Sequence, residues 1–159
     1  PIFPLEGDGF DSDNCHVEAE FWDEELKNRL DIAIMKGDRI IVAIEAKIDA
    51  EEGRRFSRKG EKVLTQLRAY DKWLDEKHPD SKNNRIFLVP DEDRDIGSEE
   101  WRKVSWRKVA KVLLEFLRTA DQASTGYHYL RFFVASIIRD IDGVSPNNVV
   151  ATASYLNAL

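Results

Sequence analysis

Two apolar runs separated by a glycine stand at the centre of the chain, over residues 29–48. In the first run one side carries Leu30, Ile32 and Ile34 and the other carries Asp31, Ala33 and Met35. The second run sets an apolar side against a side that ends in Glu45 and Lys47. A period of two is typical of a β-strand, and Gly37 falls where a tight turn would join the runs. The pattern therefore predicts a β-hairpin with one apolar face and one face that carries Asp31, Glu45 and Lys47.

The pairing register of this hairpin decides whether its charged side chains meet, because a slip of one residue moves every side chain of a strand to the opposite face. A two-residue turn would pair Leu30 with Glu45 and mix the faces. A three-residue loop or a β-bulge matches the apolar faces instead, and we expect it to bring Asp31 beside Ala43 and diagonal to Glu45, about 7–8 Å away. A divalent ion fits between two carboxylates at that separation.

The remaining elements follow from the same periodicities. An alternating segment at residues 16–22 predicts a strand that completes an antiparallel meander with the hairpin, and the apolar run at 85–89 is expected to pair with the second hairpin strand in parallel. Helical spacing predicts helices at 62–77 and 127–141, and a further helix that begins after an N-cap at Ser105. We expect one α/β domain over residues 1–159, with a mixed central sheet flanked by helices and a C-terminal helical pair (104–142) packed on the core.

The charged face of the hairpin carries residue types that bind a hard cation. Asp31 and Glu45 can hold Mg²⁺ and leave coordination positions for water and a substrate phosphate, with the backbone carbonyl of Ala46 as a further ligand. Lys47 follows Glu45 on the same side of the strand, where its amine could orient or deprotonate an attacking water and offset charge in the transition state. Asp31, Glu45 and Lys47 are therefore the candidate catalytic residues.

The next predicted helix carries Gln66 and Tyr70, four residues apart and hence on one face. If that face covers the charged side of the hairpin, the amide and the phenol can support the metal ligands. The alternative is ordinary structure, with Tyr70 a core aromatic and Gln66 a residue of the helix surface.

Asp31, the triplet Glu45-Ala46-Lys47 and the segment Gln66-Leu67-Arg68-Ala69-Tyr70 together resemble the motifs of the PD-(D/E)XK nuclease superfamily, in particular its RecB-like and lambda-exonuclease-like branches. The resemblance spans roughly residues 16 to 118. It implies a restriction-endonuclease-like core and a nuclease that hydrolyses DNA phosphodiester bonds, with Mg²⁺ as cofactor and Mn²⁺ as a substitute.

The chain departs from the superfamily pattern at three points. Leu30 stands where proline often precedes the first acid, and Ala46 stands where this branch often has asparagine, a change that keeps the backbone carbonyl. Members usually carry a helix with a further acid ahead of the first strand, whereas this sequence starts at Pro1. We expect either that this upstream helix lies outside the sequence or that Glu18 or Glu20 supplies the acid.

Charge is unevenly distributed along the chain. The net charge of −6 argues against broad adhesion to nucleic acid, because nonspecific affinity comes mostly from cations that neutralise phosphates. Residues 53–62 nevertheless form a basic run directly after the candidate site, and Arg54, Arg55 and Arg58 are its candidate contacts to the DNA backbone. The same run also suits a solvated loop and helix start.

The composition narrows the class of protein. A chain of 159 residues with 42% hydrophobic and 34% charged residues is typical of a globular domain. The single cysteine, Cys15, excludes an internal disulfide, and a reducing cytoplasm fits best. No segment has the pattern of a signal peptide or a membrane span, so no membrane partner is expected.

Two other functions stay open at this point. Asp31, Glu45 and Lys47 could form an ordinary salt-bridged sheet face, which would make the chain a catalytically inactive nuclease-fold module that binds nucleic acid or protein in a defence or repair assembly. A purely structural domain that oligomerises through its last, aromatic helix is the other alternative. A homodimer or a larger complex is compatible with all three functions.

Overall fold

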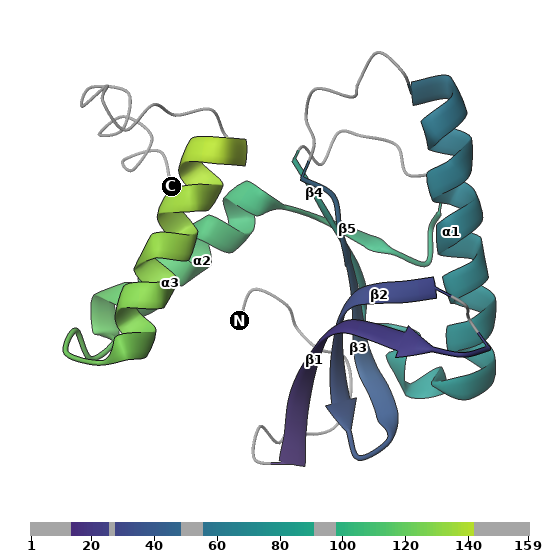
Figure 1. The fold of residues 1–159 in the computed structure, drawn as a ribbon, viewed down its shortest axis with the longest axis horizontal. Helices are drawn as coiled ribbons and strands as arrows, with labels where there is room; N and C mark the ends of the chain where they lie inside the picture. The colour runs from purple at the N-terminus through teal and green to yellow at the C-terminus, as the bar shows by residue number, and fades with distance from the viewer. Residues whose placement is uncertain (1–13, 26–27, 49–55, 91–97, 142–159) are drawn as a thin grey trace.

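The computed structural model describes residues 14–25, 28–48, 56–90 and 98–141. A five-stranded sheet in the order β1-β2-β3-β4-β5 has helix α1 on one face and helices α2 and α3 on the other (Figure 1). The strands are β1 Cys15–Asp23, β2 Asn28–Lys36, β3 Arg39–Ala46, β4 Arg85–Val89 and β5 Arg102–Ser105. The helices are α1 Phe56–Lys77, α2 Trp106–Thr119 and α3 Thr125–Ser136, with a 3-10 turn at Pro79–Ser81 and a π-helical turn at Ile137–Ile141.

The sheet is mixed, which confirms the predicted α/β class. β1, β2 and β3 form an antiparallel meander, whereas β3 pairs with β4, and β4 with β5, in parallel. The parallel partner of the hairpin is the strand that the apolar run before Pro90 predicts. β5 was not predicted, because it is only four residues long and contains one apolar side chain, Val104.

The hairpin reaches its register through both a tight turn and a bulge. Lys36 pairs with Arg39 across a two-residue turn, in which Gly37 has a φ of 60° that favours glycine. Beyond the turn the pairing shifts by one residue, so that Ile34 faces Val42. A β-bulge was one of the two arrangements expected to match the apolar faces of the hairpin. The residue expected opposite Ala43 was wrong.

The bulge sets a register that differs by two residues from the predicted one. Ala43 lies opposite Ala33, not Asp31, and Ile32 lies opposite Ile44. Continuing this antiparallel register by one position places Asp31 directly opposite Glu45, where a diagonal relation was expected.

Two hydrophobic clusters fill the space on the two faces of the sheet. The cluster under α1 contains Leu67, Tyr70, Trp73 and Leu74 of that helix, packed against residues that include Ala33, Met35, Ile40, Ala43 and Phe87. The cluster under α2 and α3 joins Val42, Ile86 and Leu88 of the sheet to Trp106, Ala110, Leu117 and Val134. Ile40 belongs to the α1 side, against the strict alternation of the sequence, because the bulge reverses the facing of the strand between Ile40 and Val42.

The ends of the helices follow local signals. α1 begins at Phe56, ahead of the predicted start at Lys62, because the basic segment before Lys62 has no apolar periodicity to mark it. It ends at Lys77, just before His78 and Pro79, as expected from the helix-terminating effect of proline. The predicted N-cap of α2 is confirmed, since Ser105 Oγ accepts a hydrogen bond from the backbone N–H of Lys108.

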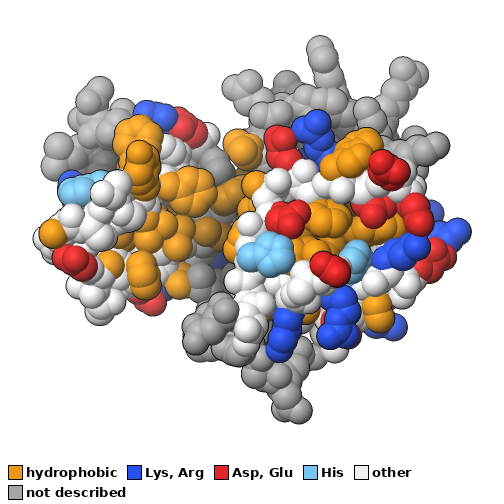
Figure 2. Space-filling view, turned by 60° about the horizontal axis from the view of Figure 1, so that its bottom comes forward, with side chains coloured by type: hydrophobic (Ala, Val, Ile, Leu, Met, Phe, Trp, Pro, Cys, Tyr) orange, Lys and Arg blue, Asp and Glu red, His pale blue; other side chains and the backbone are white. Residues whose placement is uncertain are grey.

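The α2 and α3 side of the molecule exposes several aromatic rings. Hydrophobic side chains are visible over this side in Figure 2. Tyr129 and Phe132 are each more than 70% exposed, and Phe116 and Phe133 are also exposed. Among the described helices, none is both long and apolar enough to cross a lipid bilayer.

Candidate active site

Asp31 of β2 and Glu45 of β3 lie side by side at the end of the hairpin that is remote from its turn. The Oδ2 atom of Asp31 accepts a hydrogen bond of 2.7 Å from the backbone N–H of Ala46. The carboxylate thus takes the place of a backbone acceptor at the last position of β3. This bond fixes Asp31 next to the residue that follows Glu45, so the two acids are held on neighbouring strands.

Glu45 is the most enclosed charged group of this cluster, with only 1% of its surface exposed. Its Oε1 atom accepts hydrogen bonds from Lys47 Nζ at 2.6 Å and from Gln66 Nε2 at 3.2 Å. Its Oε2 atom is buried and has no hydrogen-bond partner among the described residues. A buried carboxylate oxygen without a donor is costly, and a bound cation would satisfy it.

The surroundings of Glu45 raise the pKa of its carboxyl above the ordinary value. Burial is the main cause, since it disfavours the charged form, and the nearby negative charge of Asp31 acts in the same direction. The ammonium group of Lys47 opposes both effects without cancelling them. Asp31, Glu45 and Lys47 together bring two carboxyl groups and one ammonium group, and this composition favours the binding of a cation.

The backbone of Lys47 is held from two sides. Its N–H donates to the carbonyl oxygen of Leu88 at 2.9 Å, and its carbonyl oxygen accepts from Trp106 Nε1 at 3.0 Å. The side chain of Lys47 is 38% exposed, so its amine can reach solvent while it contacts Glu45. No signal in the sequence connects Trp106 with Lys47.

The face of helix α1 that carries Gln66 and Tyr70 covers Asp31 and Glu45. Gln66 Nε2 donates to Glu45 Oε1 and also to the hydroxyl oxygen of Tyr70, at 2.7 Å. The Tyr70 hydroxyl in turn donates to the backbone carbonyl of Arg29, two residues before Asp31. Tyr70 is fully buried, so it supports the carboxylate cluster from behind and does not reach a substrate phosphate.

The pKa of the Tyr70 phenol is raised. Burial is the main cause, and the negative charges of Glu45 and Asp31 add to it. The phenol therefore keeps its proton at neutral pH and remains a donor to the Arg29 carbonyl.

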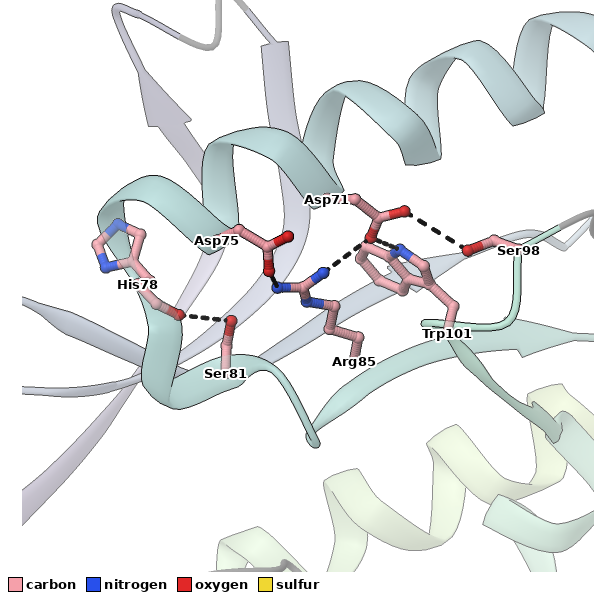
Figure 3. A network of polar contacts seen from close by, with 7 residues as sticks. All are labelled: Asp71, Asp75, His78, Ser81, Arg85, Ser98 and Trp101. Atoms are coloured by element: carbon pink, nitrogen blue, oxygen red, sulfur yellow. Dashed lines mark hydrogen bonds and ion pairs between the residues drawn. The ribbon is translucent and has the colours of Figure 1, made fainter.

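A second polar network fixes α1 against β4 (Figure 3). The fully buried guanidinium of Arg85 donates to Asp71 at 3.0 Å and to Asp75 at 2.5 Å, one helical turn further along α1. Asp71 also accepts from Trp101 Nε1 at 2.7 Å. Because Asp71 directly follows Tyr70 and Arg85 pairs with Ala43 of β3, this network holds the helix at the height at which Gln66 and Tyr70 meet the acids.

The donor set of the cluster suits a hard divalent cation. Asp31 and Glu45 offer carboxylate oxygens from two adjacent strands, and one of these oxygens is buried without a donor. Within residues 14–25, 28–48, 56–90 and 98–141, no group of three or more His, Cys, Asp or Glu side chains could hold a metal ion. A cation here would therefore have two carboxylate ligands and complete its shell with water, substrate or the Ala46 carbonyl, a pattern common for Mg²⁺.

Glu18 and Glu20, one of the two alternatives for the missing upstream acid, form ion pairs with other residues in this structure. Glu18 pairs with His16 at 3.2 Å, and Glu20 pairs with Arg29 at 2.9 Å, both near the exposed surface. Glu20 also adopts a φ of 52°, which is unusual for a strand residue other than glycine. Neither acid joins Asp31 and Glu45.

The side chains of the three arginines predicted to contact DNA are outside the part of the chain that the structure describes. Arg54 and Arg55 lie outside the described residues. Arg58 lies in the first turn of α1, but its side chain also falls outside the described part.

Comparison with protein-family models, with curated proteins and with solved structures gave no significant match. The resemblance to the PD-(D/E)XK superfamily therefore stays a prediction, which depends on the motifs and on the geometry described above.

Proposed function

We propose that this chain is a metal-dependent nuclease with a restriction-endonuclease-like core, which hydrolyses DNA phosphodiester bonds. The observation that carries the proposal is the Glu45 carboxylate, buried beside Asp31, with Lys47 on one oxygen and no donor on the other. A salt-bridged sheet face has no need for an orphaned buried oxygen, because such an atom destabilises the fold unless something binds it.

The residues that would hold Mg²⁺ or Mn²⁺ are Asp31 and Glu45, with the carbonyl of Ala46 as a further ligand. A bound divalent ion would supply Lewis-acid chemistry, by polarising the phosphate and making a bound water more acidic. The protein contributes the fixed position of both carboxylates, through the Asp31 bond to Ala46 and the Gln66 bond to Glu45.

Lys47 is the residue that we propose to act on the reacting groups. Its amine lies 2.6 Å from Glu45 and remains partly exposed, while its backbone is held by Leu88 and Trp106. In hydrolysis the oxygen of water attacks phosphorus, the bond to the leaving oxygen breaks, and negative charge accumulates on the phosphate. A lysine at this position stabilises that charge and orients the water.

The decisive experiment compares cleavage of supercoiled plasmid DNA by the wild-type chain and by Lys47→Ala, with Mg²⁺ or Mn²⁺ and with EDTA. We expect metal-dependent nicking or degradation by the wild type and loss of at least 100-fold in the variant, as is usual when a group that stabilises the transition state is removed. Lys77→Ala is the matched control, because Lys77 is an exposed lysine of α1 that pairs only with Glu25 among the described residues. Equal cleavage by wild type and Lys47→Ala would refute the assignment.

Metal binding separates the proposal from the alternative of an inactive binding module. A nuclease needs a cation affinity that depends on Asp31 and Glu45, whereas a binding module does not. Calorimetric titration with Mn²⁺ should therefore show heat for the wild type and none for Glu45→Gln. Absence of binding to the wild type would favour the inactive module.

A further inference from the structure

We propose that a cavity between α2 and α3 is a second binding site, specific for a nucleotide unit that combines a phosphate with a flat base. The cavity has a volume of about 560 Å³. This lies in the range of pockets that hold small molecules. It is formed by the second half of α2, the connection to α3 and the first turns of α3, and it shares no residue with the carboxylate cluster.

Three cationic side chains line the cavity. Lys111 and Arg118 stand seven residues apart on α2, on the same face two turns along, and Arg131 approaches from α3. None of the three forms an ion pair or hydrogen bond within the described residues. Gathering three cations around a single carboxylate, Glu115, is unfavourable, so the arrangement favours an anionic ligand.

The charge balance of the cavity is opposite to that of the protein. Glu115 is the only carboxylate among the described lining residues, so three cations and one anion leave a local excess of positive charge in a chain of net charge −6. Arginine presents planar paired donors that match two oxygens of a phosphate. The anionic part of the ligand is therefore expected at Arg118 and Arg131.

The rest of the lining suits the base of a nucleotide. Leu117 is buried and, with Leu114, supplies an apolar surface, and the half-buried ring of Tyr127 lies in the same lining. Stacking of a base on an aromatic side chain is worth more than apolar contact alone. Gln122 adds an amide that can donate to and accept from the edge of the base. An inorganic anion would use only the cationic half of this site.

The test is calorimetric titration of the full-length chain at low salt in EDTA, which prevents cleavage and removes metal-dependent binding. The probes are deoxyadenosine monophosphate, inorganic phosphate, and a short single-stranded oligonucleotide with or without a 5′-phosphate. We expect the mononucleotide to bind at least tenfold more tightly than inorganic phosphate. A strand with a 5′-phosphate that binds better than the mononucleotide identifies a strand end as the source of the ligand, and equal binding identifies the free nucleotide.

Variants connect the signal to this cavity. Arg118→Ala and Arg131→Ala should each weaken mononucleotide binding about tenfold or more, since each removes a charge-assisted hydrogen bond. Tyr127→Leu should weaken binding of the mononucleotide and leave that of phosphate unchanged. Arg39→Ala is the matched control, because Arg39 is an exposed arginine at the hairpin turn, paired with Asp80, and should bind as wild type.

Three outcomes would overturn the inference. They are no binding of any nucleotide probe, equal affinity for phosphate and mononucleotide, and unchanged affinity in both arginine variants. Lys47→Ala should bind the mononucleotide as wild type does, so failure of the nuclease proposal and failure of this site give different results.

Discussion

The carboxylate of Asp31 accepts the backbone N–H of Ala46 at 2.7 Å, so a side chain of β2 completes the hydrogen bonding of β3. The bond gives Asp31 a structural role in addition to its proposed role as a metal ligand. It also explains how the hairpin keeps two acids together despite their repulsion, because one of them is held by the backbone of the other's strand.

These two roles of Asp31 can be separated by a pair of substitutions. Asp31→Asn keeps an oxygen acceptor and removes the charge, so its free energy of unfolding should stay within about 1 kcal/mol of wild type. Asp31→Ala also removes the acceptor and should lose about 1–2 kcal/mol. Both should lose Mn²⁺ affinity. Urea unfolding and calorimetry measure the two effects, and equal stability of Asp31→Ala and wild type would contradict the structural role.

The raised pKa of Glu45 predicts a dependence of stability on pH. A carboxyl with a higher pKa in the folded state binds its proton more tightly there, so its contribution to stability is present below its unfolded pKa, near 4.5, and is lost as pH rises through the folded value. In Glu45→Gln the carboxyl group is gone, so stability is not lost in this way as pH rises. In EDTA, the stability of the variant relative to wild type should increase between pH 4 and pH 7, as measured by urea unfolding.

A matched substitution controls for general effects of pH. Glu76→Gln changes an exposed glutamate of α1. Its stability relative to wild type should change much less over the same range. If the stability of Glu45→Gln relative to wild type stayed constant or decreased with rising pH, the surroundings of Glu45 would not disfavour its charged form.

Much of this site could be predicted from the sequence because its determinants are local. The alternation of β2 and β3 and the glycine turn identify the hairpin, and helical spacing places Gln66 and Tyr70 on one face. The register could not be predicted as well. A bulge at Ile41 moves the pairing by one position, and which residue bulges depends on packing against two different layers.

Sequence patterns did not predict the contacts that support the site. Trp106 follows a four-residue strand with one apolar side chain, and its bond to Lys47 joins segments 59 residues apart. Arg85 lies in a run of otherwise apolar residues, so nothing local indicates that it would be buried against acids of α1. Both contacts require the positions of α1, α2 and β4 around the sheet.

Tyr70 provides a test of how α1 is attached to the hairpin. Tyr70→Phe removes the hydroxyl that accepts from Gln66 and donates to the carbonyl of Arg29. Because it leaves a carbonyl without its donor, the substitution should lower the free energy of unfolding by about 1–2 kcal/mol. Tyr129→Phe, at a ring that is 74% exposed, should stay within about 0.5 kcal/mol. Equal stability of the two variants in urea unfolding would exclude a structural role for the buried hydroxyl.

Arg85 tests whether the buried network of Figure 3 fixes the position of α1. Arg85→Met keeps much of the side-chain volume but leaves Asp71 partly buried without its cation, and burial already raises the pKa of Asp71. We expect a loss of about 3–5 kcal/mol in urea unfolding, as for other buried ion pairs that lose one partner. Asp75→Asn should cost less than about 1 kcal/mol, because the Asp75 side chain is 53% exposed and its pair with Arg85 is screened by water. If Asp75→Asn were as destabilising as Arg85→Met, the buried Arg85–Asp71 pair would not be the main anchor of the helix.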